Sequence, residues 1–422
     1  MRVLIAVAPL TAHLYPSVPL AWALQSAGHE VRLASGTELA EQISAAGLTA
    51  VRLGGDPASP MPHVSEAELD RFSEALGFEP GSDYGRLWQA IRYYLVANVA
   101  RYYPDAEGQQ PLADNLVEFA RDWRPDLVIW DVANPVGSVA ARESGAASAR
   151  LLWGADYFGW IHGRLTERAA QRGAQANPLA ETMAPVFGRY GYDYSQQMVL
   201  GDFTIDPLPT HTQLPRSPGQ RVVPMRFVPY TGAVPVPEWL LRAPSRPRVC
   251  LSLGVTKRKV TSSRDERLAA VFEAVAGMDV EVVATVNADQ LGEGQKVPDN
   301  VRMVDYLPLT QVTPTCSAII HHGGFGTFFA AAEHRVPHMI ITEELGTGLS
   351  SSRYLEARGA GVALHSDDLT AAQVARELSR LLTEPSFQQG AAAVYADMVA
   401  APSPAEIVPI LERMAAQHRT GG

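Results

Sequence analysis

An alternation of apolar strands and amphipathic helices fills the first 53 residues and constrains the fold more than any other feature. Residues 3–7 are all apolar, as expected for a strand that is buried on both faces. After this strand the pattern predicts a loop at 9–16, helices at 18–27 and 38–46, each closed by a glycine, and strands at 30–33 and 48–53. This β-α-β-α-β order predicts a parallel, doubly wound sheet.

A second alternation of the same kind begins at residue 249. Strands are predicted at 249–253, 280–286, 301–306, 318–321 and 339–342, and helices at 268–276, 326–333, 372–382, 391–399 and 405–417. Two large α/β domains also agree with a length of 422 residues. We expect the two sheets to face each other across a cleft, because open α/β sheets bind ligands at the carboxyl ends of their strands.

Two segments interrupt the alternation. Residues 54–114 are an aromatic and polar mixture, and such insertions often carry specificity. Residues 207–247 contain ten prolines, which is typical of an interdomain connector. We therefore predict a first domain at 1–215, a proline-rich linker at 216–247, a second domain at 248–400, and a C-terminal helix at 401–422 that returns toward the first domain.

Composition excludes several classes of partner. A net charge of −10 leaves no extended basic surface for nucleic acid or anionic lipid, so a phosphate ligand requires a local binding device. No stretch approaches the ~18 apolar residues of a membrane span. Cys250 and Cys316 lie in apolar runs, which suits reduced thiols in a cytoplasmic protein. The first residues resemble a short signal peptide but lack a small-residue cleavage site, and we interpret them as a strand.

Several chemistries lack their usual motifs. The sequence has no G-x-x-x-x-G-K-[ST], G-x-S-x-G, H-E-x-x-H or C-x-x-C pattern. The loop after the first strand contains no glycine, so the dinucleotide-binding fingerprint is absent there. No two aspartates lie two residues apart, which removes the D-x-D pattern of metal-bound sugar nucleotides. We therefore expect no cofactor and no metal, and anion stabilisation by protein groups.

The strongest motif is a glycine-histidine turn at residues 321–327, His-His-Gly-Gly-Phe-Gly-Thr, between a predicted strand and a predicted helix. Glycines let backbone amides approach a diphosphate, and a helix N-terminus offers free N–H groups and partial positive charge. His322 and Thr327 can donate further hydrogen bonds. The alternative is a glycine-rich turn with a core histidine.

A second candidate site lies in the first domain. His13 follows the first strand and Asp131 ends the strand predicted at 127–130, so both are expected at the same edge of the sheet. A neutral imidazole can accept a proton from a hydroxyl near pH 7, and a carboxylate orients it and stabilises its charged form. The alternative is an ordinary loop histidine.

The sequence resembles the family 1 glycosyltransferases of GT-B fold, which consists of two Rossmann-like domains, and within it the actinobacterial deoxysugar transferases of the erythromycin, tylosin and anthracycline branch of antibiotic biosynthesis. The resemblance spans nearly the whole chain. It is carried by residues 20–24, 27–32, 46–51, 124–130, 149–154, 204–207, 225–230, 248–254, 298–302, 321–327 and 402–409.

The resemblance implies inverting, metal-independent transfer of a deoxysugar, usually from a dTDP donor, to a hydroxyl of a polyketide-type product. It assigns His13 as general base and Asp131 as its partner. Donor contacts are implied for Ser252, Gly254, Leu307, His322, Gly324, Gly326 and Thr327, with Tyr306-Leu307 packing on the nucleotide base. Trp153 and Tyr157 are candidates for the acceptor site, although core packing explains them equally well.

One departure from the family pattern concerns the sugar. An acidic or Asp-Gln pair that hydrogen-bonds sugar hydroxyls is replaced here by Thr347 and Gly348. We expect a donor that lacks one or more ring hydroxyls, because a carboxylate without a partner would be costly in such a site. Alternatively, Glu343 or Glu344 takes over the contact.

Two other functions fit the same fold. One is a catalytically silent binding or auxiliary subunit, and the other is a nucleotide-sugar epimerase. The resemblance also implies a P450-like activator protein as a partner, and a homodimer is one option for the oligomeric state. The aglycone, the exact deoxysugar and the choice among O-, C- and N-linkage are left open.

Overall fold

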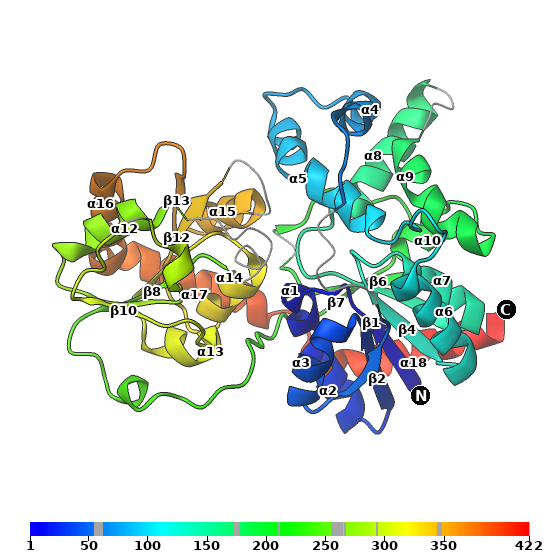
Figure 1. The fold of residues 1–422 in the computed structure, drawn as a ribbon, viewed down its shortest axis with the longest axis horizontal. Helices are drawn as coiled ribbons and strands as arrows, with labels where there is room; N and C mark the ends of the chain where they lie inside the picture. The colour runs from blue at the N-terminus through cyan, green and yellow to red at the C-terminus, as the bar shows by residue number, and fades with distance from the viewer. Residues whose placement is uncertain are drawn as a thin grey trace. The chain divides into compact units, whose positions relative to one another are not determined.

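A computed structural model describes residues 1–54, 62–172, 177–209, 212–254, 265, 267–292, 294–343 and 348–421. The chain divides into two compact units. Met1–Val228 and Ala401–Gly422 form the first unit, and Pro229–Ala400 form the second. The elements of both can be followed by label and colour in Figure 1.

The first unit contains a sheet of seven parallel strands in the order β3-β2-β1-β4-β5-β6-β7. Its elements are β1 (Arg2–Ala6), α1 (Thr11–Leu14), α2 (Val18–Ser26), β2 (Glu30–Ser35), α3 (Ala40–Ala45), β3 (Thr49–Arg52), α4 (Glu66–Leu76), α5 (Asp83–Ala100), α6 (Pro111–Trp123), β4 (Leu127–Asp131), α7 (Val136–Ser144), β5 (Ala147–Leu151), α8 (Tyr157–Arg172), α9 (Pro178–Phe187), α10 (Gln196–Leu200), β6 (Phe203–Asp206), β7 (Val222–Pro224) and α18 (Pro404–Gly421). The first strand occupies the residues that could have passed for a signal peptide.

The second unit contains a sheet of six parallel strands in the order β10-β9-β8-β11-β12-β13. Its elements are β8 (Arg248–Ser252), α12 (Arg267–Ala276), β9 (Glu281–Ala284), β10 (Val301–Met303), α13 (Leu309–Val312), β11 (Ala318–His321), α14 (Phe325–Ala332), β12 (His338–Thr342), α15 (Gly348–Ala357), β13 (Gly361–His365), α16 (Ala371–Thr383) and α17 (Pro385–Val399). The prediction of two doubly wound parallel sheets is confirmed.

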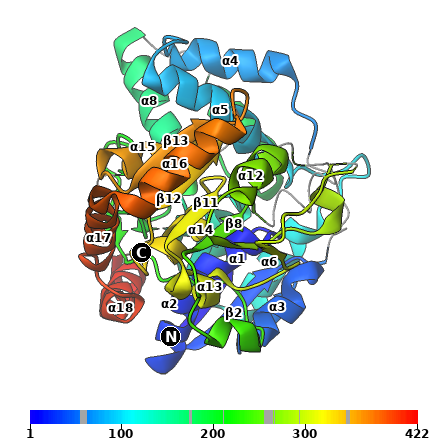
Figure 2. The same ribbon diagram turned by 90° about the vertical axis from the view of Figure 1, so that its left-hand side faces the viewer.

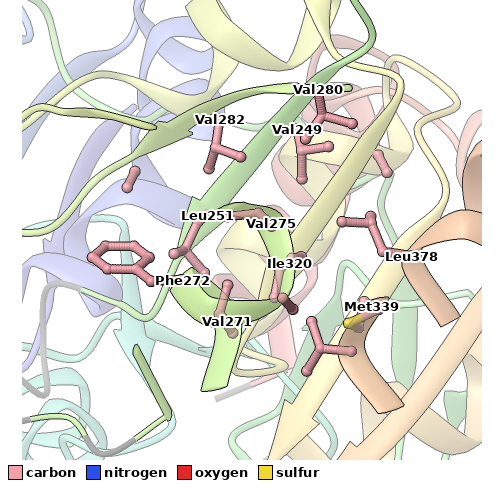
Figure 3. Close-up of a cluster of buried hydrophobic side chains, with 14 of the residues drawn as sticks. Val249, Leu251, Val271, Phe272, Val275, Val280, Val282, Ile320, Met339 and Leu378 are labelled. Carbon is pink, nitrogen blue, oxygen red and sulfur yellow. The ribbon is translucent and has the colours of Figure 1, made fainter. Parts of the chain in front are cut away.

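Alternate residues of the second sheet point into two separate apolar cores. Val249 and Leu251 of β8 pack with residues of α12 and α16, which lie side by side over one face of the sheet (Figures 2 and 3). Cys250, between them in the chain, packs on the other face with residues that include Ala330 and Ala331 of α14. This period of two follows from the pleat of a strand, and burial of both faces explains why the strands read as continuous apolar runs.

The insertion at 54–114 is largely helical where it is described. Helix α4 begins with a capping box between Ser65 and Glu68 and ends at Gly77, which has a positive φ of 55°. In α5, Trp88, Ile91 and Leu95 are buried at helical spacing. Core packing therefore accounts for part of the aromatic run.

Strand β7 and helix α18 complete the first unit. Strand β7 lies inside the proline-rich segment, at the edge of the sheet, where a proline such as Pro224 removes no ladder hydrogen bond. Helix α18 packs on α2 and β5, and its residues Ile407 and Leu411 are fully buried. Arg419 of this helix forms an ion pair with Asp126 at 2.6 Å.

Among the described residues, no helix has both the length and the apolar character that crossing a membrane would demand. Both cysteines are free, as the sequence suggested.

Gly137 gives a test of packing between α7 and β4. A Cβ atom built on Gly137 would lie 2.1 Å from Cβ of Trp130, which is buried. We expect Gly137→Ala to lower the free energy of unfolding by about 1–3 kcal/mol, because this overlap outweighs the better helix propensity of alanine. Urea unfolding measures the change. Gly188→Ala is the control, since a Cβ there meets no atom within 4 Å and φ is −62°. Equal stability of the two variants would contradict the prediction.

Candidate active site

The first group of polar residues lies where the strand order of the first sheet reverses, between β1 and β4. His13 belongs to α1, which follows β1, and Asp131 is the last residue of β4. Nδ1 of His13 lies 2.6 Å from Oδ2 of Asp131. The two side chains are 7% and 2% exposed, so their interaction is largely shielded from water. The predicted pairing of these two residues is therefore present in the structure.

The loop predicted at 9–16 is not irregular throughout. Thr11–Leu14 form a one-turn helix, which continues into a 3₁₀ turn at Tyr15–Ser17 and then into α2. Pro16 lies near the start of the 3₁₀ turn, and the fixed φ of proline suits a helical backbone. His13 is consequently held by helical backbone and not by a loop.

Among the described residues, the Asp131 carboxylate accepts four hydrogen bonds. Oδ2 accepts from His13 and from the backbone N–H of Ala8 at 3.0 Å. Oδ1 accepts from the backbone N–H of Ala133 at 2.9 Å and from the indole N–H of Trp153 at 3.0 Å. The indole ring also packs against the His13 ring, with centroids 4.5 Å apart and planes inclined by 54°. These donors satisfy the hydrogen-bonding capacity of a buried carboxylate.

This arrangement fixes the tautomer of His13. Because Nδ1 faces an ionised carboxylate, it carries the hydrogen, and Nε2 carries the lone pair. A neutral imidazole oriented in this way can accept a proton at Nε2 while the carboxylate stabilises the resulting positive charge. The pair thus has the geometry of a general base and its orienting partner.

The second group lies where the strand order of the second sheet reverses, between β8 and β11. Ser252 ends β8 and pairs in register with His321, the last residue of β11. Gly254 follows β8 with φ of 89°, and His322 follows β11. Both turns leave the sheet at its carboxyl edge, where doubly wound folds bind ligands.

The glycines of this group make room for the His322 ring. A Cβ on Gly254 would lie 2.7 Å from Cε1 of His322, and one on Gly324 would lie 2.5 Å from its Nε2. The positive φ of Gly254 adds a second reason for glycine there. The ring is therefore fixed against the backbone at both positions.

The start of α14 offers uncapped backbone donors. Gly324 is the N-cap residue and provides no side-chain cap, and the helix begins at Phe325. The N–H groups of the first turn have no carbonyl of their own helix to bind, and they suit an anion. Gly326 is exposed and Thr327 is half-buried in this turn.

His322 is neutral at physiological pH. Burial lowers its pKa to about 4, with the positive charge of Arg267 acting in the same direction. Arg267 itself is buried and bound by Asp265, with two N–O distances of 2.8 and 2.6 Å, and by Glu343 at 3.2 Å. His322 thus offers a hydrogen bond rather than a positive charge, and Glu343 is held by an arginine.

His321 braces the glycine-histidine turn through hydrogen bonds. Its Nδ1 accepts the N–H of Gly323 at 3.2 Å, so its hydrogen is on Nε2, which donates to Nδ1 of His338 at 3.0 Å. Gly323 has φ of 91°, and its carbonyl accepts a hydrogen bond from Ser351 at 2.6 Å. The alternative of a core histidine therefore applies to His321, while His322 is the next residue of the turn.

Of the Thr347-Gly348 pair, which differs from the family pattern, the structure describes only Gly348. Thr347 and Glu344 lie outside the described residues. Gly348 begins α15, and a Cβ there would lie 2.9 Å from the His322 carbonyl oxygen. Close contact with the glycine-histidine turn is therefore a physical reason for glycine at this position.

The remaining predicted residues separate into exposed and buried ones. Leu307 is buried in the core with Cys250, whereas Tyr306 is exposed and donates its hydroxyl hydrogen bond to the Thr231 carbonyl. Tyr157 is 9% exposed at the start of α8. Trp153, predicted as an acceptor contact, bonds Asp131. Among the described residues, no cluster of three or more metal-ligating side chains is present.

Sequence reasoning missed several participants. The bond from Trp153 to Asp131, the backbone donors of Ala8 and Ala133, and the bracing of Gly323 by His321 depend on strand register, which residue types alone do not reveal. The one available signal was that Trp153 follows the strand adjacent to the one that ends in Asp131.

Comparison with known proteins defines the class. The crystal structure of the glycosyltransferase VinC in complex with dTDP superimposes with a TM-score of 0.81 and 35% sequence identity, covering 99% of this chain and all of that one. The two sheets thus form the GT-B fold of a glycosyltransferase. Residues 22–254 and 269–414 match the N-terminal and C-terminal domains of the erythromycin biosynthesis protein CIII-like proteins. The chain belongs to this family.

Two curated relatives align over nearly the whole chain. Aclacinomycin-T 2-deoxy-L-fucose transferase of Streptomyces galilaeus is 40% identical, covering 99% of this chain and 97% of that protein. The 10-deoxymethynolide desosaminyltransferase of Streptomyces venezuelae is 38% identical, covering 99% and 98%.

The buried histidines of the second unit predict acid sensitivity. Burial lowers the pKa of His338 to about 3, below the ~6.5 of an unfolded histidine. Between these values the unfolded chain binds a proton that the folded chain does not, so the free energy of unfolding falls as pH falls below about 6.5. We expect a loss of up to about 1.4 kcal/mol per pH unit for each such histidine.

Chemical unfolding at pH 7 and pH 5 measures this loss. His338→Met should reduce the difference between the two pH values. His365→Gln, which changes an exposed histidine, should leave the difference as it is. An unchanged difference in His338→Met would contradict the prediction.

Proposed function

We propose that this glycosyltransferase inverts the anomeric configuration as it transfers a deoxysugar from a dTDP donor to a hydroxyl of a polyketide-type product. The observation that carries the proposal is the contact of 2.6 Å between buried His13 and Asp131 at the carboxyl edge of the first sheet. His13 acts as the general base, and the product is O-linked.

In the proposed reaction, Nε2 of His13 removes the proton of the acceptor hydroxyl as its oxygen attacks the anomeric carbon of the donor. The bond from that carbon to the diphosphate breaks on the opposite side, so the configuration inverts. Asp131 stabilises the imidazolium that forms, and no covalent intermediate is required.

The second unit acts on the leaving group. We assign the diphosphate to the N–H groups at the start of α14, with neutral His322 and Thr327 as further donors. Donors fixed before the reaction stabilise charge as it develops on the diphosphate, at little cost in reorganisation. Ser252 and Gly254, on the neighbouring turn, are assigned to the same ligand, and Tyr306-Leu307 to the base. VinC was crystallised in complex with dTDP, which supports the choice of nucleotide.

The relatives support a deoxygenated sugar and a polyketide acceptor. Their names specify a 2-deoxy-L-fucose transferase and a desosaminyltransferase that acts on 10-deoxymethynolide. The tight contact of Gly348 with the His322 carbonyl excludes a longer side chain at this position unless the turn moves. Without such a side chain, position 348 offers no side-chain group to bind sugar hydroxyls.

Replacement of His13 tests the catalytic assignment. His13→Ala should lower kcat by about 10² or more, the usual contribution of a general base, while dTDP binding measured by calorimetry stays unchanged. Near-normal turnover in this variant would refute the role. Loss of dTDP binding would show that the change acts through folding.

Donor comparison tests the sugar. We expect kcat/KM for a 2,3,6-trideoxyhexose donor to exceed that for dTDP-glucose by about tenfold or more, because hydroxyls that find no partner are costly to bury. Inhibition by dTDP alone controls for the shared nucleotide. A preference for dTDP-glucose would contradict the proposal. Nucleotide release that requires an aglycone distinguishes a transferase from an epimerase, and any turnover excludes a silent subunit.

Two proposals on protein partners rest on family resemblance alone. One is a P450-like activator protein, and the other is a homodimer. Light scattering of the purified chain measures the oligomeric state, and full activity without a second protein would contradict the need for an activator.

A further inference from the structure

We infer that Trp153 is a positioning residue for the His13–Asp131 pair, and not primarily a wall of the acceptor site. The inference rests on the proposed function of His13 as general base. It starts from two contacts of one side chain: the indole N–H donates to Oδ1 of Asp131 at 3.0 Å, and the indole ring packs on the imidazole of His13 at 4.5 Å.

The hydrogen bond from Trp153 sets the plane of the carboxylate. Asp131 presents one oxygen to His13 and Ala8, and the other oxygen to Ala133 and Trp153. Of the three described donors other than His13, two are backbone N–H groups, and Trp153 is the one whose bond a side-chain substitution can remove. Without it, the N–H of Ala133 is the donor that the described residues still give to Oδ1, and the plane of the carboxylate is less restrained.

The ring contact restrains the imidazole. His13 is held by α1 through its backbone and by Asp131 through Nδ1. The indole packs on the imidazole and limits rotation of the imidazole away from Asp131. A general base must hold its lone pair in one direction, because small misplacements slow proton transfer.

Trp153 can act in this way because the chain around it is itself fixed. It follows β5, in which Leu151 pairs in register with Asp131. The carbonyl of Leu151 accepts the N–H of Val132 at 3.1 Å, and the N–H of Leu152 bonds to Ile205 of β6 at 3.0 Å. Backbone hydrogen bonds to the strands on both sides therefore fix the backbone position from which the Trp153 side chain extends.

A buried ion pair also fixes the C-terminal end of the turn that carries Trp153. Asp156 accepts from fully buried Arg150 at 2.5 Å, from Gln220 at 2.9 Å and from the N–H of Gly159 in the first turn of α8 at 2.8 Å. Arg150 and Asp156 thus bracket Trp153 in sequence and fix the turn that carries it. Breaking such a buried pair is strongly destabilising, so the turn has little freedom.

The hydrogen bond also affects charge. Each N–H donor disperses part of the negative charge of Asp131, and loss of one leaves more charge facing the imidazole. More charge favours the protonated ring. The acidic limb of the pH profile of kcat/KM should therefore move to higher pH when the indole N–H is removed.

Two substitutions at position 153 separate the N–H from the ring. Trp153→Phe keeps an aromatic face toward His13 and removes the donor. Benzothienylalanine in place of Trp153 keeps the shape of the indole and replaces the N–H by sulfur, so its folding is not in question. We expect each to lower kcat about tenfold, the size of one hydrogen bond to a charged group, to raise the acidic limb of the pH profile, and to leave the acceptor KM within about twofold.

Trp22→Phe is the matched control. The indole N–H of Trp22 donates to the Ala46 carbonyl at 2.8 Å in the same unit, so the control loses an indole hydrogen bond that does not involve Asp131. Its kcat and pH profile should equal those of the unchanged protein.

The outcomes separate a failure of the role inferred for Trp153 from a failure of the role proposed for His13. If His13→Ala abolishes turnover but both changes at Trp153 leave kcat and the pH profile unaltered, Trp153 has no positioning role and only the inference fails. A raised acceptor KM with unchanged kcat overturns it in favour of an acceptor wall. If His13→Ala stays active, the general base itself is wrong and the inference falls with it. Lower kcat, a shifted pH profile, and no further loss when Trp153→Phe is added to His13→Ala support it.

Discussion

Parallel pairing of all strands in each sheet is the constraint on which the rest of the structure depends. It places the carboxyl ends of all strands at one edge, and reversal of the strand order opens a crevice at one point of that edge. In the first sheet this point lies between β1 and β4, and in the second between β8 and β11. His13 with Asp131, and Gly254 with His322, follow these strands, so topology alone brings together side chains that are far apart in the sequence.

Among the described residues, the anion site proposed for the second unit relies on neutral donors. Arg267 is bound by two carboxylates, and His322 is neutral because burial lowers its pKa. Backbone N–H groups and a neutral imidazole remain as donors. Fixed dipoles of this kind can stabilise a diphosphate without having to be reorganised.

The sheets could be predicted from the sequence because strands buried on both faces are apolar throughout, as in residues 3–7 and 249–253. The pairing of His13 with Asp131 followed from their positions after two such strands. Other features require three-dimensional register. Glycines 254 and 324 are predicted as phosphate contacts, and the structure adds a second reason for glycine there, because their missing side chains make room for the His322 ring. Trp153 looked like a pocket aromatic, and only the pairing of β4 with β5 brings it to Asp131.

Helix α18 makes the folding of the first unit non-local. The ribosome synthesises strands β1 to β7 first, then the whole second unit, and only then the helix that covers α2 and β5. Until that moment the apolar surface that Ile407 and Leu411 bury is exposed on the nascent chain. The second unit can fold while the first waits for its last helix, so the order of completion reverses the order of synthesis.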